Sequence, residues 1–202
     1  MKILSLGKTI ALSSLLAIMP LQSAKSFQLI KTETEKDLFI RTVTPQGTDN
    51  KNVLKNAPSS LVNIQGKNKN AKFVIDLSIN ILYKYDNDGN AQNAYLIASG
   101  KPSMKTEKGV RIVSHVEKFP YRGAPRRSKR RRHPRAYGPF TIVLNKIDTK
   151  TGEESSTGQF IHGTNVPTSI GKYASHGCMR MDNEIITELS KEVKRGDIIL
   201  IK

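Results

Sequence analysis

The 202-residue sequence predicts a mainly β domain, a sandwich or barrel, with one main helix near its C-terminal end. Short runs of β-branched and aromatic residues follow one another closely between turn signals. A single later segment instead repeats its apolar residues at helical spacing. Closely spaced strands joined by turns favour a sandwich or barrel over a parallel sheet, in which strands would alternate with helices.

The first predicted strands form a hairpin. The runs 73–77 and 80–85 are rich in β-branched and aromatic residues, and the second meets an Asp-Asn-Asp-Gly turn signal at 86–89. The run 94–98 is expected to return beside it. Further predicted strands are 110–116, 140–144, 159–162 and 197–201.

The predicted helix begins after Asp182, which can cap its N-terminus. Its apolar residues fall on one face, namely Ile185, Ile186, Leu189 and Val193. Basic side chains near its end suit the negative pole of the helix dipole, and Gly196 is expected to end it.

Three regions are predicted along the chain. Residues 1–26 have the order of a secretory signal: a basic start, an apolar run over 9–19, and small residues near a cleavage site. That run is shorter than the roughly 20 apolar residues that a membrane-spanning helix needs. An uncleaved membrane anchor is therefore the weaker alternative. No membrane span is expected after the signal has been cleaved. Residues 27–71 are expected to be an extension or linker, because 44–71 have a spacer's composition. The folded domain is expected at 72–202.

The charge is strongly basic, with 33 basic and 17 acidic residues and a formal net charge of +16. Residues 1–26 hold three lysines and no acid, so the chain without them carries +13. For an exported protein this favours anionic wall polymers or membrane surfaces as partners, and no nucleic acid is expected.

The basic segment, residues 122–135, carries eight Lys and Arg side chains and no acid. Such a run repels itself and is expected to be a solvated loop. We expect it to attract an anionic wall polymer or the carboxylates of a substrate. A nucleic-acid partner fits these residues equally well taken alone, but an export signal argues against it.

Cys178 is the only cysteine, in a protein expected to be exported to a compartment where cysteines usually pair. It follows Ser175-His176-Gly177, and His162 lies sixteen residues before it. The thiolate is the nucleophilic form of cysteine, and a nearby imidazole can take the thiol proton. Gly177 allows close backbone approach, so that the N–H groups of Gly177 and Cys178 can face a developing oxyanion.

The residues alone leave other interpretations open. Cys178 could be a small core side chain, and both histidines could be ordinary hydrogen-bonding residues. A zinc site could use His162, His176 and Cys178 with His115 as the fourth ligand, although the His-x-Cys spacing is unusual for zinc.

Residues 72–202 resemble the catalytic domain of the L,D-transpeptidases, the YkuD-type domain. The resemblance rests on His162-Gly163-Thr164 followed by Ser175-His176-Gly177-Cys178, including the separation of the first histidine from the cysteine. The opening hairpin and the closing strand support it, whereas the turn at 106–109 lacks the proline that the family often has. The resemblance implies that family's β-sandwich or barrel, with its main helix after the catalytic cysteine.

The resemblance also implies an activity on peptidoglycan stem peptides, without metal or cofactor. Cys178 would attack the carbonyl at the L-centre of the diamino acid in a stem tetrapeptide and expel the terminal D-alanine. His162 would act as base and then acid, and His176 would position or polarise the thiol. An amine of a neighbouring stem would resolve the thioester into a 3→3 cross-link.

Substrate contacts are expected from Gly163, Thr164, Ser175 and Arg180. Many relatives have asparagine at the position of Arg180, whose guanidinium can bind a carboxylate bidentately; an ordinary structural arginine is the alternative there.

Other activities stay open. Water in place of the acceptor amine would make the enzyme an L,D-carboxypeptidase. A non-catalytic cationic wall-binding protein is one alternative, but it would have no need of the complete set of histidines and cysteine. A sortase-like enzyme is another, but it would not place a histidine so close before its cysteine. An exported location is expected, with a periplasm favoured over the cell wall or medium.

Overall fold

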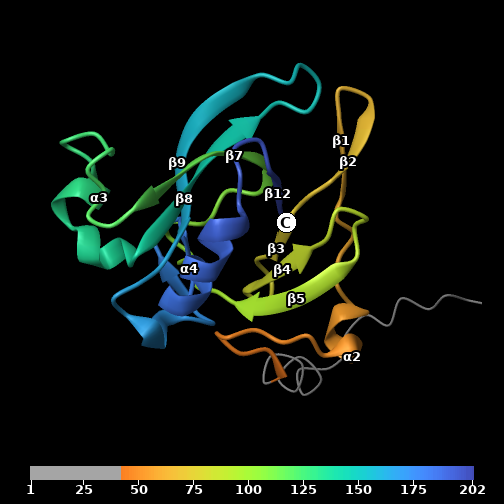
Figure 1. Ribbon diagram of the computed structural model, residues 1–202, viewed down its shortest axis with the longest axis horizontal. Coiled ribbons are helices and arrows are strands. Elements are labelled where there is room, and N and C mark those ends of the chain that lie inside the picture. The colour runs from red at the N-terminus through yellow and green to blue at the C-terminus, as the bar shows by residue number, and fades with distance from the viewer. Residues whose placement is uncertain (1–41) are drawn as a thin grey trace, which may run out of the picture.

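The computed structural model describes residues 42–202. Its centre is an eight-stranded sheet with the order β11-β9-β8-β7-β12-β3-β4-β5, curled into a half-barrel (Figure 1). Neighbouring strands are antiparallel except in the pairs β11–β9 and β12–β3. The strands of this sheet are β3 (Phe73–Asp76), β4 (Ile81–Tyr85), β5 (Ala91–Leu96), β7 (Gly109–Lys118), β8 (Phe140–Ile147), β9 (Glu154–His162), β11 (Met179–Arg180) and β12 (Ile198–Ile201). The predicted mainly β class is confirmed.

Each run predicted as a strand overlaps a strand of this sheet, because its β-branched and aromatic side chains fill one or both faces of the sheet. The returning strand of the first hairpin begins at Ala91, three residues before the prediction. In β9 the pairing with β8 shifts between Gln159 and Ser156, which leaves Thr157 and Gly158 as a bulge. Gly158 has φ +66°, a conformation that favours glycine.

The main helix, α4 (Asn183–Glu192), packs on one face of the sheet (Figure 1). Asp182 caps it as predicted, since its carboxylate accepts the N–H groups of Glu184 and Ile185. The predicted end is wrong. Val193 already has extended backbone, and Gly196 lies beyond the helix. The core under α4 contains Ile186, Leu189, Val193, Phe73, Ile75, Leu82, Val113, Ile142, Leu144, Ile161 and Met179.

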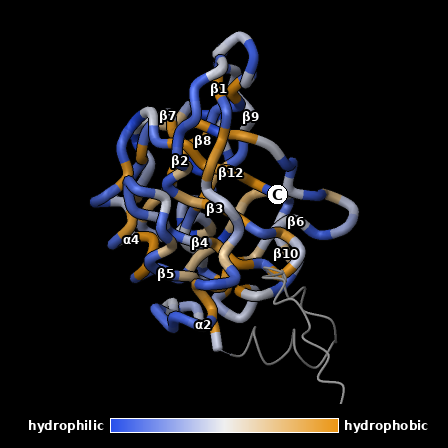
Figure 2. Tube along the Cα trace, turned by 90° about the vertical axis from the view of Figure 1, so that its right-hand side faces the viewer, coloured by the Kyte–Doolittle hydropathy of each residue, from blue (hydrophilic) through white to orange (hydrophobic). Residues whose placement is uncertain are grey.

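The other face of β3 and β4 is covered by residues that the sequence predicted to be a spacer. They form helix α2 (Lys51–Leu54) and the hairpin of β1 (Leu61–Ile64) and β2 (Lys67–Asn70). Val53, Val62 and Ile64 are buried in a second core with Val74, Ile81 and Tyr83. Each such burial contributes about 1.5–3 kcal/mol, so the spacer interpretation is wrong for residues 51–70. Figure 2 shows apolar residues along most strands of the main sheet, whereas β2 and much of the connecting loops are hydrophilic.

Short elements border the site. Strand β6 (Ser99–Gly100) pairs with β10 (Tyr173–Ser175), and the basic segment contains α3 (Lys129–Arg132). Two 3-10 turns are η1 (Pro134–Tyr137) and η2 (Pro167–Ser169).

The predicted signal at 1–26 and the first part of the extension lie outside the described residues. Within 42–202, no helix has the length and apolar character needed to cross a membrane.

Candidate active site

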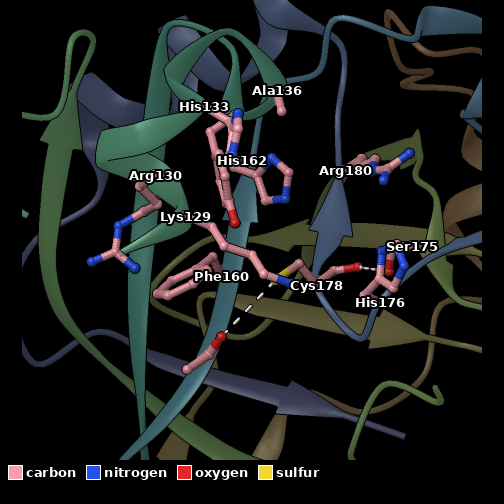
Figure 3. A pocket seen from close by; sticks show the side chains of 12 residues that line it. Lys129, Arg130, His133, Ala136, Phe160, His162, Ser175, His176, Cys178 and Arg180 are labelled. Atoms are coloured by element: carbon pink, nitrogen blue, oxygen red, sulfur yellow. Dashed lines mark hydrogen bonds between the residues drawn. The ribbon is translucent and has the colours of Figure 1, made fainter. Parts of the chain in front are cut away.

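Cys178 lies immediately before β11, which runs parallel to β9 with Arg180 opposite His162. Side chains alternate along a strand, so positions two residues apart share a face. Cys178 and Phe160 therefore face the same side as Arg180 and His162. All four line one pocket of about 670 Å³ (Figure 3). The parallel pairing thus brings together the two residues predicted to form the catalytic pair.

The turn before Cys178 is fixed by Ser175. The buried Ser175 hydroxyl donates to the Cys178 carbonyl at 2.6 Å and accepts the Gly177 N–H at 3.0 Å. Gly177 has φ +111°, which favours glycine. Because Ser175 engages the Gly177 N–H, the N–H of Cys178 is the better placed oxyanion donor; it makes no hydrogen bond within residues 42–202.

The His162 imidazole is buried, with 4% of the residue exposed. Its Nδ1 lies 2.5 Å from the Gly163 carbonyl oxygen. A carbonyl can only accept, so Nδ1 carries the proton and Nε2 is left as a proton acceptor. Burial lowers the pKa of His162 to about 4, although the bond to Gly163 acts in the opposite direction. His162 is therefore neutral near pH 7.

The surroundings of Cys178 are also of low dielectric constant, although the residue as a whole is only partly buried. Burial raises the pKa of the Cys178 thiol, while the Phe160 backbone and the charges of Arg180, Arg130 and Lys129 lower it in part. Its Sγ lies 4.0 Å from the carbonyl oxygen of Gly158, in the β9 bulge. A protonated thiol beside a neutral imidazole favours proton transfer during attack over a preformed thiolate–imidazolium pair.

Gly163 and Thr164 lie outside the pocket lining. The Asn183 side chain, at the start of α4, accepts the Thr164 N–H at 2.8 Å and donates to the Thr164 carbonyl at 2.9 Å. A Cβ on Gly163 would lie 2.3 Å from Asn183 Oδ1. The two residues thus hold the loop after His162 against α4, and their substrate contacts stay a prediction.

His176 and Arg180 both line the pocket. His176 is exposed at the rim, and its imidazole makes no hydrogen bond within residues 42–202. Arg180 is half-buried, and its Nη1 is 3.5 Å from Ser169 Oγ. His115, considered above as a zinc ligand, instead contacts Glu117 at 3.2 Å and lines a separate cavity. In the part of the chain that the structure describes, no three His, Cys, Asp or Glu side chains converge as metal ligands.

Much of the pocket wall consists of residues that the sequence did not indicate. Gly158 and Phe160 precede His162 at intervals of two on the same strand, so strand periodicity could have indicated them. The other missed residues come from the basic segment and the turn after it, and no local signal places those beside Cys178. They are Lys129, Arg130, His133, Ala136 and Tyr137.

The basic segment is anchored beside the pocket. The Arg130 guanidinium donates to both oxygens of Glu117, at 2.6 and 3.3 Å, and lies over the Phe160 ring. The Tyr137 ring lies 4.6 Å from the His162 ring, centroid to centroid. The prediction of a wholly solvated loop is therefore wrong for Arg130, which is 8% exposed. The exposed basic side chains of the segment are Arg122, Arg126, Arg127, Lys129, Arg132 and Arg135.

The sequence is similar to those of known proteins. YkuD of Bacillus subtilis is 51% identical over 114 residues, which cover 56% of this chain and 56% of that protein. YkuD of Bacillus licheniformis is 30% identical over 130 residues, 64% of each chain. Both matches thus span less than two thirds of the relative's length.

A likeness in fold extends to Bd1075 of Bdellovibrio bacteriovorus, with a TM-score of 0.50, 22% identity, and coverage of 72% of this chain and 53% of that one. The family model for the L,D-transpeptidase catalytic domain matches residues 70–201. The chain therefore belongs to the YkuD family of L,D-transpeptidase catalytic domains.

Proposed function

We propose that this protein is a peptidoglycan L,D-transpeptidase that forms 3→3 cross-links through a Cys178 thioester and releases D-alanine. The observation that supports this most is the convergence of Cys178 and a neutral, tautomerically fixed His162 in one pocket. No Asp or Glu lines that pocket, which suits a donor peptide ending in a carboxylate.

In the first half-reaction, Cys178 Sγ bonds to the carbonyl carbon of the diamino acid while the thiol proton passes to His162 Nε2. The Cys178 N–H stabilises the oxyanion. The carbon–nitrogen bond then breaks, and Nε2 returns the proton to the leaving nitrogen. D-alanine departs, and the thioester remains.

In the second half-reaction, the side-chain amine of a neighbouring stem attacks the thioester carbon and gives its proton to His162 Nε2. The carbon–sulfur bond breaks, and Sγ recovers the proton. His176 lies at the rim, where it can contact the arriving acceptor or the thiol. Water in place of the amine would yield a tripeptide, the carboxypeptidase outcome.

The test is incubation of the protein, and of a Cys178→Ala variant, with disaccharide-tetrapeptides, followed by mass analysis. Dimers that have lost one D-alanine, formed only by the native protein, are the expected products. Tripeptide monomers without dimers would assign carboxypeptidase activity instead. An unchanged substrate with folded native protein would overturn the enzymatic proposal and leave a wall-binding role.

We also propose that the protein is exported and acts in the periplasm. The supports are the signal-like order of residues 1–26 and the extracytoplasmic location of peptidoglycan. Mass analysis of the protein recovered from a periplasmic fraction should show a chain shortened by about the length of a signal peptide. A full-length chain in the cytoplasmic fraction would contradict export.

The exposed part of the basic segment is proposed to bind anionic wall polymers. Six of its Lys and Arg side chains are exposed, and they carry no acidic partner within residues 42–202. Uncompensated charge of one sign attracts polyanions at long range. The polymer would then hold the enzyme close to its substrate.

A further inference from the structure

Arg111 of β7 places a positive charge in the interior of the domain. The residue is 0% exposed, and its acidic partner within residues 42–202 is Glu107, whose side chain is 57% exposed and lies 3.3 Å away. A buried ion pair contributes little to stability, and an apolar side chain of similar volume often serves as well. A guanidinium at this position is therefore explained better by the groups that it holds than by stability.

The guanidinium holds the bulge of β9. Arg111 Nε donates to Gln159 Oε1 at 2.7 Å, and Gln159 directly follows Gly158 of the bulge. The Gln159 N–H donates to the Thr157 hydroxyl at 3.0 Å. The carbonyl oxygen of Gly158 is the group that lies 4.0 Å from Cys178 Sγ (Figure 3, dashed line from the sulfur). Arg111 is therefore linked through β9 to a backbone group that contacts the nucleophile.

The same guanidinium holds the turn at 106–109, which contains no proline to stiffen it. Its Nη2 donates to the carbonyl oxygens of Glu107 and Lys108, at 3.1 and 3.3 Å. The Gln159 side-chain amide donates to the same Glu107 carbonyl at 3.2 Å. Two carbonyl groups of exposed residues are thereby fixed to the interior of the sheet.

The segment that leads into this turn lies against the residues before the nucleophile. The Lys101 N–H donates to the Ser175 carbonyl oxygen at 3.0 Å. The Lys105 carbonyl oxygen would lie 3.6 Å from a Cβ on Gly177. A displaced turn would displace this segment too, and the backbone that precedes Cys178 would lose a neighbour.

We infer that Arg111 is a positioning residue for the reaction at Cys178. Its guanidinium joins the β9 bulge to the turn at 106–109, and these two elements fix the Gly158 carbonyl and the backbone beside Gly177 around the sulfur. Arg111 does not line the pocket, so it acts through these groups and not on the substrate. The inference deepens the proposed function and rests on it for the expected change in turnover, but not for the expected change in the thiol.

The first test is the pH dependence with which iodoacetamide alkylates the single cysteine. Burial is the largest influence on the pKa of the Cys178 thiol and raises it, and the β9 bulge is part of what buries the sulfur. Arg111→Met should let the bulge and the turn move apart, so the pH midpoint of alkylation should fall towards the ordinary value of a thiol. The charged groups that lower this pKa are left unchanged in the variant, and they are Arg180, Arg130 and Lys129.

The second test is turnover. The rate constant of dimer formation by Arg111→Met should fall about a hundredfold, the effect of a shift of about 1 Å in a reacting group. Donor affinity, measured with Cys178→Ala in both backgrounds, should change little. Arg111→Lys should recover little of the rate or of the alkylation midpoint, because one ammonium cannot replace the fork that joins Gln159 to the turn.

A second variant tests the link itself. Gln159→Met should reproduce part of both changes, and its addition to Arg111→Met should cause no further loss, since both substitutions break the same connection. Val74→Ala, which opens a cavity in the second core, is the control for lost stability. It should keep the native alkylation midpoint and the native rate.

A native alkylation midpoint in folded Arg111→Met would overturn the inference, as would an equal shift in Val74→Ala. Full recovery by Arg111→Lys would also overturn it, because charge alone would then be sufficient. If Arg111→Met does not fold, Gln159→Met decides, and a native midpoint in that variant would overturn the inference. Failure of the proposed function is separate, since it would appear as missing dimers with the native protein while the alkylation comparison still decides the role of Arg111.

Discussion

The guanidinium of Arg130 lies 4.2 Å from the centroid of the Phe160 ring, on which it stacks. Phe160 is two residues before His162 and faces the same pocket as Cys178. Arg130 is also paired with Glu117 of β7. One side chain therefore joins the basic segment to the wall of the active site, and Lys129 is brought to the pocket as its neighbour in sequence.

Replacing Arg130 by Gln should destabilise the protein, because it leaves the buried Glu117 carboxylate without its cation. Removal of one partner of a buried ion pair costs about 3–5 kcal/mol. Denaturant unfolding of the variant measures this loss. The exposed Arg127→Gln variant should change the free energy of unfolding by no more than about 0.5 kcal/mol. Equal stability of the two variants would show that the pair does not anchor the segment.

Gly163→Ala should disrupt the loop that holds the His162 tautomer. The new Cβ would lie 2.3 Å from Asn183 Oδ1 and 2.8 Å from Pro139 Cδ, so the loop or α4 must shift. Overpacking of this kind costs about 1–3 kcal/mol, and activity should fall further because Nδ1 loses its carbonyl partner. Thermal unfolding and dimer formation measure the two effects. Gly123→Ala meets no atom within 4 Å and should leave both unchanged.

Ser175→Ala should slow the reaction by misplacing Cys178. The variant loses both hydrogen bonds of the turn, to the Cys178 carbonyl and from the Gly177 N–H. A shift of about 1 Å in a catalytic group can cost a hundredfold in rate. The rate constant of dimer formation should fall while donor affinity changes little, and Ser175→Thr, which keeps the hydroxyl, should recover part of it. A loss of affinity alone would instead assign Ser175 to substrate binding.

His162 should make the protein less stable in acid. Its folded pKa of about 4 is below its ordinary value of 6.5, so the unfolded chain binds the proton first as the pH falls. The stabilisation is complete above pH 6.5 and is lost as the pH falls towards about 4. The loss attributable to this residue is about 3 kcal/mol. Unfolding titrations should therefore be less steep over this range for His162→Gln than for the native protein; identical slopes would contradict the buried neutral imidazole.

Binding to isolated wall material should depend on salt. Replacing Arg126, Arg127 and Arg132 by Ser should weaken sedimentation with cell walls, most at low ionic strength, where charges are least screened. The same charge removed at Lys51, Lys55 and Lys150 should have a smaller effect, because those exposed lysines lie outside the basic segment. Equal effects of the two triple variants would mean that net charge alone governs the association.

The pattern of the sequence was enough for the strands of the main sheet other than β11 and for the Asp182 cap, because each depends on local signals, whereas the Cys178–His162 pair was indicated by the resemblance to a known family. Strand periodicity and turn residues are local, and so is the Ser175-His176-Gly177-Cys178 motif. The hairpin at 61–70 was missed for a physical reason. Only alternate residues of β1 are buried, so the segment has the polar composition of a spacer. Val62 and Ile64 are buried only because they pack against the outer face of β3 and β4, which the local sequence does not indicate.

The roles within the site depended on contacts between segments far apart in the chain. The sequence by itself determined that Cys178 is the nucleophile candidate and His162 its partner. Only the tertiary structure decided that Gly163 and Thr164 position His162, that Ser175 fixes the turn, and that the basic segment forms a pocket wall. The reason is that a charged run is solvated unless a distant partner is present, and Glu117 and Phe160 are partners of Arg130 only after β7 and β9 have paired with β8.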